Sequence, residues 1–183
     1  MKKSEKILPV ILMVWPYVFS IFLFLPDKTG EAHINFLIAY TIATLFVYGL
    51  NIWNAFSFHG TDQQLSFYGM LIKLVHIPFY AIGFALGALL LLSMVVPAFL
   101  FLSPIFLVVL AAVEFFLMLA SSMYGISASV RMARKGCLPK KSAVIYIVLH
   151  FIFVTDVISA ISLYKKLDKN REKFSRSTSN NMI

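Results

Sequence analysis

The sequence is poor in cysteine and in charge, and both shortages restrict what the protein can be. Its single cysteine, Cys137, excludes an intramolecular disulfide and every zinc or iron–sulfur site that needs several cysteines. Charged residues make up 13% of the 183 residues, about half the share of an ordinary soluble domain, whereas 60% are hydrophobic. A chain of this length cannot hide so much apolar surface inside a water-soluble fold, so we expect lipid to surround most of it.

Motifs of common enzyme classes are also missing. The chain has no HExxH zinc motif, no GxSxG nucleophile elbow and no Walker-type phosphate loop. We therefore expect no enzyme activity, no cofactor and no metal. A membrane peptidase would need Cys137 as its nucleophile, in a basic Arg-Lys-Gly-Cys stretch with His150 as the nearest histidine. An ordinary loop residue or a juxtamembrane acylation site explains Cys137 equally well.

Apolar residues are gathered in five long runs. They predict an all-α, polytopic integral membrane bundle over residues 1–164, with hydrophobic helices at about 7–25, 33–56, 66–95, 105–130 and 142–164, and then a basic, mobile tail at 165–183. The first run has no small-x-small cleavage site, so we interpret it as a retained span rather than a signal peptide. Pro16 within this run lacks a backbone donor, and the carbonyl that it frees must find a neighbouring helix or water.

Polar and small residues recur on one face of the middle helices. One such stripe comprises Thr41, Thr44, Tyr48, Asn51 and Ala55, and another comprises Ala111, Glu114, Met118, Ser121, Gly125 and Ala128. A polar stripe on a lipid-length helix should face protein, which predicts interhelical hydrogen bonds, with a solute path as the alternative.

Two local motifs concern the third helix. Thr61 and Gln64 have the spacing of a capping box that would begin it. Gly83 and Gly87 form a GxxxG pair that favours close helix packing, to which small residues such as Ser121 and Gly125 of the next helix contribute.

The net charge of +8 is concentrated where apolar runs end: Lys2, Lys3 and Lys6, then Arg131, Arg134, Lys135, Lys140 and Lys141, then residues 165–176. This distribution is typical of anchoring beside anionic lipid on the cytoplasmic side, and we expect no nucleic-acid partner. The amino terminus is therefore predicted to be cytoplasmic. Four crossings also place the 131–141 loop inside, but a fifth would place the basic tail outside. Either the last segment is re-entrant or interfacial and returns the tail, or five helices cross.

Ionisable residues inside apolar runs are costly and need a reason. Glu114 lies about ten residues after Pro104, hence roughly 15 Å deep. Lys73 and His76 lie on the adjacent antiparallel helix, and Asp156 lies on the last segment. Our hypothesis is that these four residues form an intramembrane polar cluster that binds a proton, ion or small solute. The alternative is a structural ion pair that fixes helix register. Glu114 would then pair with His76, which lies nearer the middle of the membrane, or with the long side chain of Lys73.

Three stretches resemble a family of small, uncharacterised multi-pass membrane proteins of clostridia-like Gram-positive bacteria. They are residues 71–78 (LIKLVHIP), 124–131 (YGISASVR) and 151–160 (FIFVTDVISA). The resemblance implies no activity, but it directs attention to Lys73, His76, Pro78, Arg131 and Asp156. We expect a structural or interaction component of the bacterial cell (inner) membrane, in contact with the lipid bilayer and with a membrane-protein partner or a second copy. A small transporter or transporter subunit is the alternative.

Overall fold

The described part of the protein is entirely helical. The structure, a computed structural model, describes residues 3–23, 31–136, 138–149 and 155–167, and these ranges contain no strand. The helices are α1 (Lys3–Leu23), α2 (Glu31–Ser57), α3 (Asp62–Ser93), η1 (Pro97–Phe99), α4 (Leu102–Arg134) and α5 (Lys140–Leu149), with a further helical segment at 155–167. The predicted all-α class is confirmed.

The start of α3 and the link to α4 follow from local sequence. The Thr61 hydroxyl accepts a hydrogen bond from the backbone N–H of Gln64 at 3.2 Å, and the Gln64 side chain accepts one from the backbone N–H of Thr61 at 3.2 Å. The predicted capping box is therefore present. Pro97 begins η1, where its missing N–H leaves no helical bond unmade, and this single turn returns the chain into α4.

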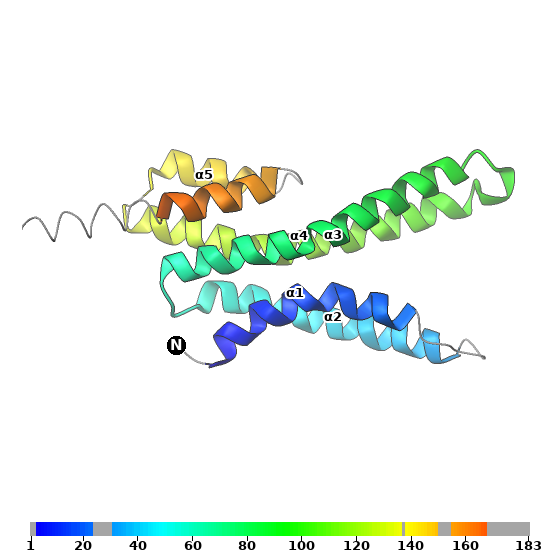
Figure 1. Cartoon of the computed structure of the whole chain (residues 1–183), viewed down its shortest axis with the longest axis horizontal. Coiled ribbons are helices and arrows are strands. Elements are labelled where there is room, and N and C mark those ends of the chain that lie inside the picture. The colour runs from blue at the N-terminus through cyan, green and yellow to red at the C-terminus, as the bar shows by residue number, and fades with distance from the viewer. Residues whose placement is uncertain (1–2, 24–30, 137, 150–154, 168–183) are drawn as a thin grey trace, which may run out of the picture.

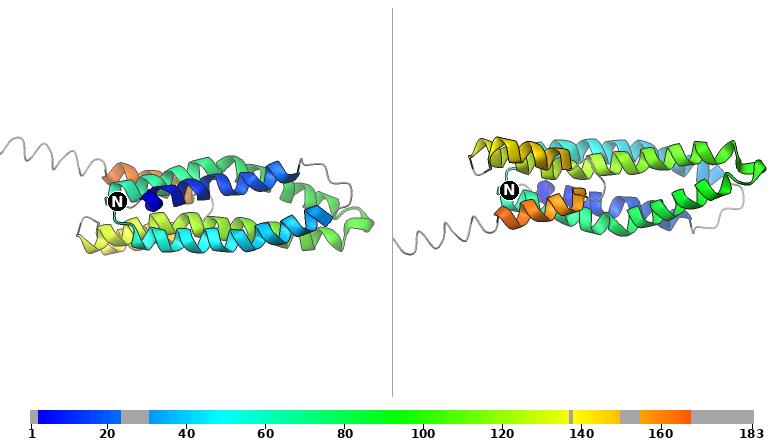
Figure 2. Two further views of the ribbon diagram at one scale, coloured as in Figure 1. Left: turned by 90° about the horizontal axis from the view of Figure 1, so that it is seen from below. Right: turned by 90° about the horizontal axis from the view of Figure 1, so that it is seen from above.

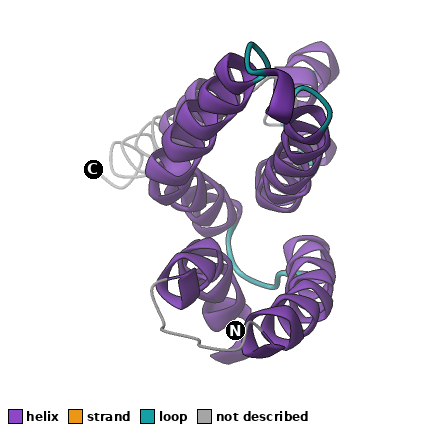
Figure 3. Cartoon of the chain, turned by 90° about the vertical axis from the view of Figure 1, so that its right-hand side faces the viewer, coloured by secondary structure: helices purple, strands orange, loops and turns teal. Residues whose placement is uncertain are grey.

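The four long helices form two antiparallel pairs. Helix α1 runs beside α2, α3 runs beside α4, and the pairs meet where α1 packs on α3 and α2 packs on α4 (Figures 1 and 2). Figure 3 shows the helices from the end where α3 turns into α4. The core lies between the pairs, and Leu12, Leu65, Ile72, Leu117 and Tyr124 are fully buried there.

Three helices in the described ranges, rather than five, are long and apolar enough to cross a membrane: 35–57, Asp62–Ser93 and Leu102–Arg134. At 1.5 Å per residue α3 and α4 are each about 50 Å long, which exceeds the roughly 30 Å of a bilayer's hydrocarbon. Their far ends form a two-helix arm around η1 with large exposed apolar side chains, including Phe84, Val95 and Phe101. Water is a poor solvent for such a surface, whereas lipid is a good one.

The expected fifth helix over 142–164 is wrong. The Tyr146 hydroxyl lies 3.1 Å from the Ser162 hydroxyl, and the Lys166 ammonium lies 6.0 Å from the centre of the Tyr146 ring. In one continuous helix, Tyr146 and Ser162 would be about 24 Å apart. Helix α5 and the segment at 155–167 therefore run in opposite directions side by side, and we call these two segments the C-terminal hairpin (Figure 1). Over the residues that the structure describes, neither segment is long enough to cross the hydrocarbon.

The hairpin places the end of the described chain beside the start of α3. Tyr164 packs against Phe67, with ring centres 5.7 Å apart. The first turn of α1, the α2–α3 link, the α4–α5 link and the end of 155–167 thus lie at one end of the bundle, which we call the basic end (Figure 1). Its basic side chains include Lys6, Arg131, Arg134, Lys135, Lys141, Lys165 and Lys166. The expected mobile tail falls mostly in 168–183, outside the described residues.

Candidate functional site: a buried ion pair and capped proline kinks

A buried ion pair joins α3 to the C-terminal hairpin. The Lys73 ammonium contacts the Asp156 carboxylate, and both residues are at most 3% exposed. The Ser122 hydroxyl of α4, fully buried, lies 3.1 Å from the Lys73 ammonium and 3.5 Å from both carboxylate oxygens. Three elements therefore meet at one charged contact.

This geometry explains why each charge tolerates burial. An ammonium or carboxylate removed from water loses several kcal/mol of solvation, which only an opposite charge and further hydrogen bonds can offset. Lys73 and Asp156 supply the opposite charges, and Ser122 supplies a hydrogen-bonding group to both. The sequence analysis did not identify Ser122, because its side chain is polar but small. The only signal was its position one residue after Ser121, a member of the predicted stripe.

His76 is buried near this pair but has a different partner. Its Nε2 lies 3.0 Å from the backbone oxygen of Leu12, and the residue has no exposed surface. Leu12 is four residues before Pro16, so its carbonyl is the one that Pro16 leaves without an intrahelical donor. With the proton on Nε2, the His76 ring donates to that carbonyl. We predicted that a neighbouring helix or water must bond to the freed carbonyl, and the partner is His76 of the neighbouring α3.

The second proline of α1 is capped in the same way. Pro9 frees the carbonyl of Glu5, and the Asn54 side-chain amide of α2 donates to it at 3.2 Å. The same amide donates to the Tyr124 hydroxyl of α4 at 3.1 Å, and that hydroxyl donates to Asn51 at 2.8 Å. Two asparagines and one tyrosine thus bind α1, α2 and α4 together.

Most of the polar stripe on α2 faces protein, as predicted. Thr44 accepts a hydrogen bond from the Trp15 indole at 2.8 Å, Asn51 accepts from Tyr124, and the Ala55 carbonyl accepts from Ser127 at 2.7 Å. Thr41 instead donates to the Leu37 carbonyl of its own helix. Interhelical hydrogen bonding is therefore the main use of this stripe.

Glu114 stands apart from the ion pair. It lies eight residues before Ser122 on α4, about 12 Å along the helix axis. Its carboxylate fills the space left by Gly83, since a Cβ at Gly83 would lie 1.6 Å from Oε1. This Oε1 is buried and has no hydrogen-bond partner among the described residues. The structure therefore pairs Lys73 with Asp156 rather than with Glu114, and it distributes the four predicted cluster residues over three places.

Among the glycines of α3, the one against the backbone of α4 is Gly69 and not a member of the GxxxG pair. A Cβ at Gly69 would lie 3.3 Å from the backbone nitrogen of Gly125. Gly83 instead accommodates Glu114, and Gly87 has only ordinary contacts with leucine side chains. The buried Ser121 hydroxyl donates to the Met118 carbonyl at 2.9 Å. Gly125 is thus placed at the tight contact, but its partner is Gly69.

Charged side chains tie the links at the basic end. The Arg131 guanidinium donates to the Phe58 and Phe56 carbonyls at 2.6 and 2.9 Å, where α2 ends. These carbonyls lack intrahelical donors, so the cation caps the negative end of the helix. The Lys135 ammonium lies 2.7 Å from the Asp62 carboxylate in the first turn of α3.

A further pair, Glu5 with His59, joins α1 to the α2–α3 link. The Glu5 carboxylate accepts from the His59 backbone at 3.3 Å and lies 2.9 Å from its ring. Burial acts to raise the pKa of Glu5, but the hydrogen bonds and charge of His59 outweigh it and hold that pKa below its ordinary range.

Cys137 and His150, the two residues that a peptidase would need, lie outside the described residues. In the described ranges, no three His, Cys, Asp or Glu side chains are placed to hold a metal ion.

The contact between His76 and the Leu12 carbonyl can be tested by a second substitution that restores stability. His76→Leu removes the donor to the Leu12 carbonyl, and we expect it to lower the free energy of unfolding in detergent by about 1–2 kcal/mol. Pro16→Ala restores a backbone N–H that can bond to the same carbonyl, so the double variant should recover much of this loss. If Pro16→Ala lowers stability equally in both backgrounds, the proposed exchange of donors does not occur.

The comparisons with known proteins identify a family but no activity. Residues 5–169 match the family of unknown function DUF6652, so the chain belongs to that family. The match includes all but the first two residues of α1, as well as the three stretches that had suggested a resemblance. No curated protein and no solved structure is significantly similar to the chain.

Proposed function

We propose that this member of a family of unknown function is a multi-pass protein of the bacterial cell membrane that acts as a structural or interaction component. The proposal rests on one observation: the buried polar side chains of the bundle bind to other parts of the protein. Lys73, Asp156 and His76 are almost fully buried, and each has a partner on another element. A solute path would need such groups to face water or a substrate, whereas a packed scaffold needs them to face each other.

The proposed topology has four crossings, with the basic end in the cytoplasm. Three are made by the helices that are long and apolar enough to cross, and the fourth by α1, whose 21 residues extend about 31 Å, close to the thickness of the hydrocarbon. Helix α1 runs the same way along the bundle as α3 (Figure 1) and contributes the capped proline kinks. The C-terminal hairpin supports this arrangement because it returns the chain to the basic end without a fifth crossing. The basic residues that the structure describes at the start of α1, in the α4–α5 link and at the end of 155–167 then lie on the cytoplasmic side, whereas a fifth crossing would separate them.

The topology can be tested with one cysteine. Arg134 is exposed at the end of α4. Arg134→Cys in a Cys137→Ser background should react with a membrane-impermeant maleimide only after the cells are opened. Rapid labelling on intact cells would reverse the proposed orientation.

A transporter or proton-binding role is the second candidate, and Glu114 favours it. Its carboxylate lies against Gly83 with one oxygen buried and unpartnered among the described residues. A carboxyl group in this place could hold a proton without an ion pair. The candidate requires that water or a hydrated solute can reach Glu114.

Cysteine accessibility separates the two candidates. In the Cys137→Ser background, we expect Ser122→Cys and Glu114→Cys to be unreactive toward a small water-soluble thiosulfonate, because a scaffold keeps its interior dry. Lys141→Cys, at an exposed position of the basic end, is the reactive control, and Phe84→Cys is the lipid-facing control. Reaction at position 122 comparable to that at 141 would contradict the structural role, and reaction at position 114 alone would favour the second candidate.

A further inference from the structure

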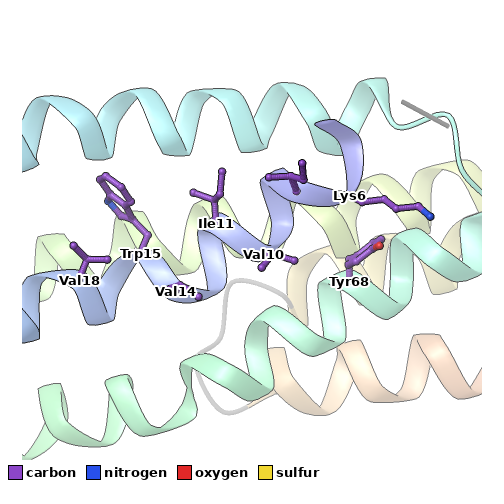
Figure 4. A pocket seen from close by; sticks show the side chains of 8 residues that line it. Lys6, Val10, Ile11, Val14, Trp15, Val18 and Tyr68 are labelled. Carbon is purple, nitrogen blue, oxygen red and sulfur yellow. The ribbon is translucent and has the colours of Figure 1, made fainter. Parts of the chain in front are cut away.

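An open apolar groove of about 600 Å³ runs along α1 (Figure 4). Its wall is formed mainly by aliphatic side chains one turn apart, including Val10, Val14 and Val18. Lys6 and Tyr68 lie at the basic end of the groove. The distance along α1 from Lys6 to Val18 is about 18 Å, close to the roughly 15 Å depth of one leaflet of hydrocarbon.

The charged end of the groove carries a single available cation. Lys6 is exposed, and no described residue forms an ion pair or hydrogen bond with it. The neighbouring acid, Glu5, is buried and already held by His59. Lys6 can therefore receive an anionic group that enters from the headgroup layer.

A second cavity of about 310 Å³ adjoins this end, because Tyr68 lines both. Its other lining residues are Gln63, Gln64, Phe67 and Tyr164, which come from the start of α3 and from the C-terminal hairpin. Amide and phenol groups are suited to hydroxyl groups rather than to acyl chains. An apolar groove, a cation and a polar cavity thus follow one another from the membrane interior outward.

We propose that these two cavities bind one anionic glycerophospholipid with a hydroxylated headgroup. One acyl chain lies along Val10, Val14 and Val18, the phosphate pairs with Lys6, and the headgroup hydroxyls contact the cavity around Gln63 and Tyr164. The site rests on the proposed membrane location with the basic end at a headgroup layer. It adds a specific lipid to the general contact that every membrane protein makes, and it gives α1 and the hairpin a common ligand.

Trp15 lines the groove and serves as the reporter. The chain has two tryptophans, so Trp53→Phe leaves Trp15 as the sole indole. This variant is placed in phosphatidylcholine nanodiscs that contain increasing fractions of lipid with brominated acyl chains. We expect brominated phosphatidylglycerol to quench Trp15 at lower mole fractions than brominated phosphatidylcholine does.

Two substitutions test whether the preference for phosphatidylglycerol over phosphatidylcholine arises at the groove. Lys6→Gln should reduce the preference for phosphatidylglycerol about fivefold, whereas the matched control Lys141→Gln, at the same end but outside the groove, should leave it unchanged. Val14→Phe narrows the groove and should weaken quenching by both lipids. If Lys6→Gln does not fold, Val14→Phe still tests whether lipid occupies the groove.

Equal quenching by the two brominated lipids would overturn the proposal, as would equal effects of Lys6→Gln and Lys141→Gln. Either result leaves stable incorporation into nanodiscs untouched, so the lipid site can fail while the proposed membrane role stands. Failure to incorporate into nanodiscs at all would instead contradict the membrane role itself.

Discussion

Lys73 and Asp156 carry opposite charges in the interior of the bundle, and the position of the C-terminal hairpin depends on their contact. Either charge alone would be a buried ion with no opposite charge beside it, and this would strongly destabilise the bundle. Together with Ser122 they join α3, α4 and the segment at 155–167 at one point. The hairpin, in turn, returns the chain to the basic end. A single ion pair thus links the packing of the interior to the position of the last described residues at the basic end.

Proline kinks impose a second constraint on the same bundle. Pro9 and Pro16 each leave one carbonyl of α1 without its usual donor, and lipid offers no replacement. Asn54 from α2 and His76 from α3 supply the missing donors. Because the two donors come from different helices, they fix the rotation of α1 about its axis and its position along that axis relative to α2 and α3. His76 therefore has a structural use that a search for catalytic or ligand-binding histidines would overlook.

The sequence was most informative where a backbone requirement has one local solution. The Thr61–Gln64 capping box, the orphan carbonyl of Pro16 and the inward face of the α2 stripe could all be predicted, because each follows from spacing within one helix. The last segment could not. Residues 142–164 are apolar, and 150–154 contain neither glycine nor proline, so nothing local distinguishes one long helix from two short ones. Only the positive-inside rule favoured a return of the chain.

The candidate site was predicted in composition but not in arrangement. Lys73 and Asp156 were both singled out by the cost of burying charge, yet their pairing required the reversal at the hairpin. Glu114 was expected near His76 or Lys73 because α3 and α4 are antiparallel neighbours. Helices α3 and α4 are instead aligned so that Glu114 lies against Gly83 and Ser122 lies beside Lys73. The spacing of residues within one helix does not determine how two helices are aligned along their axes. Asn54 and Tyr124 were missed because each lies one residue before a member of a predicted stripe, Ala55 and Gly125, and was not counted in it.

Lys73 and Asp156 stabilise the fold as a pair rather than as independent groups. A double-mutant cycle with Lys73→Met, Asp156→Leu and the combined variant, measured as free energy of unfolding in bicelles, tests it directly. We expect each single substitution to cost about 3–5 kcal/mol and the double substitution to cost much less than either, because it leaves no unpaired charge. Costs that simply add in the double variant would contradict the pairing.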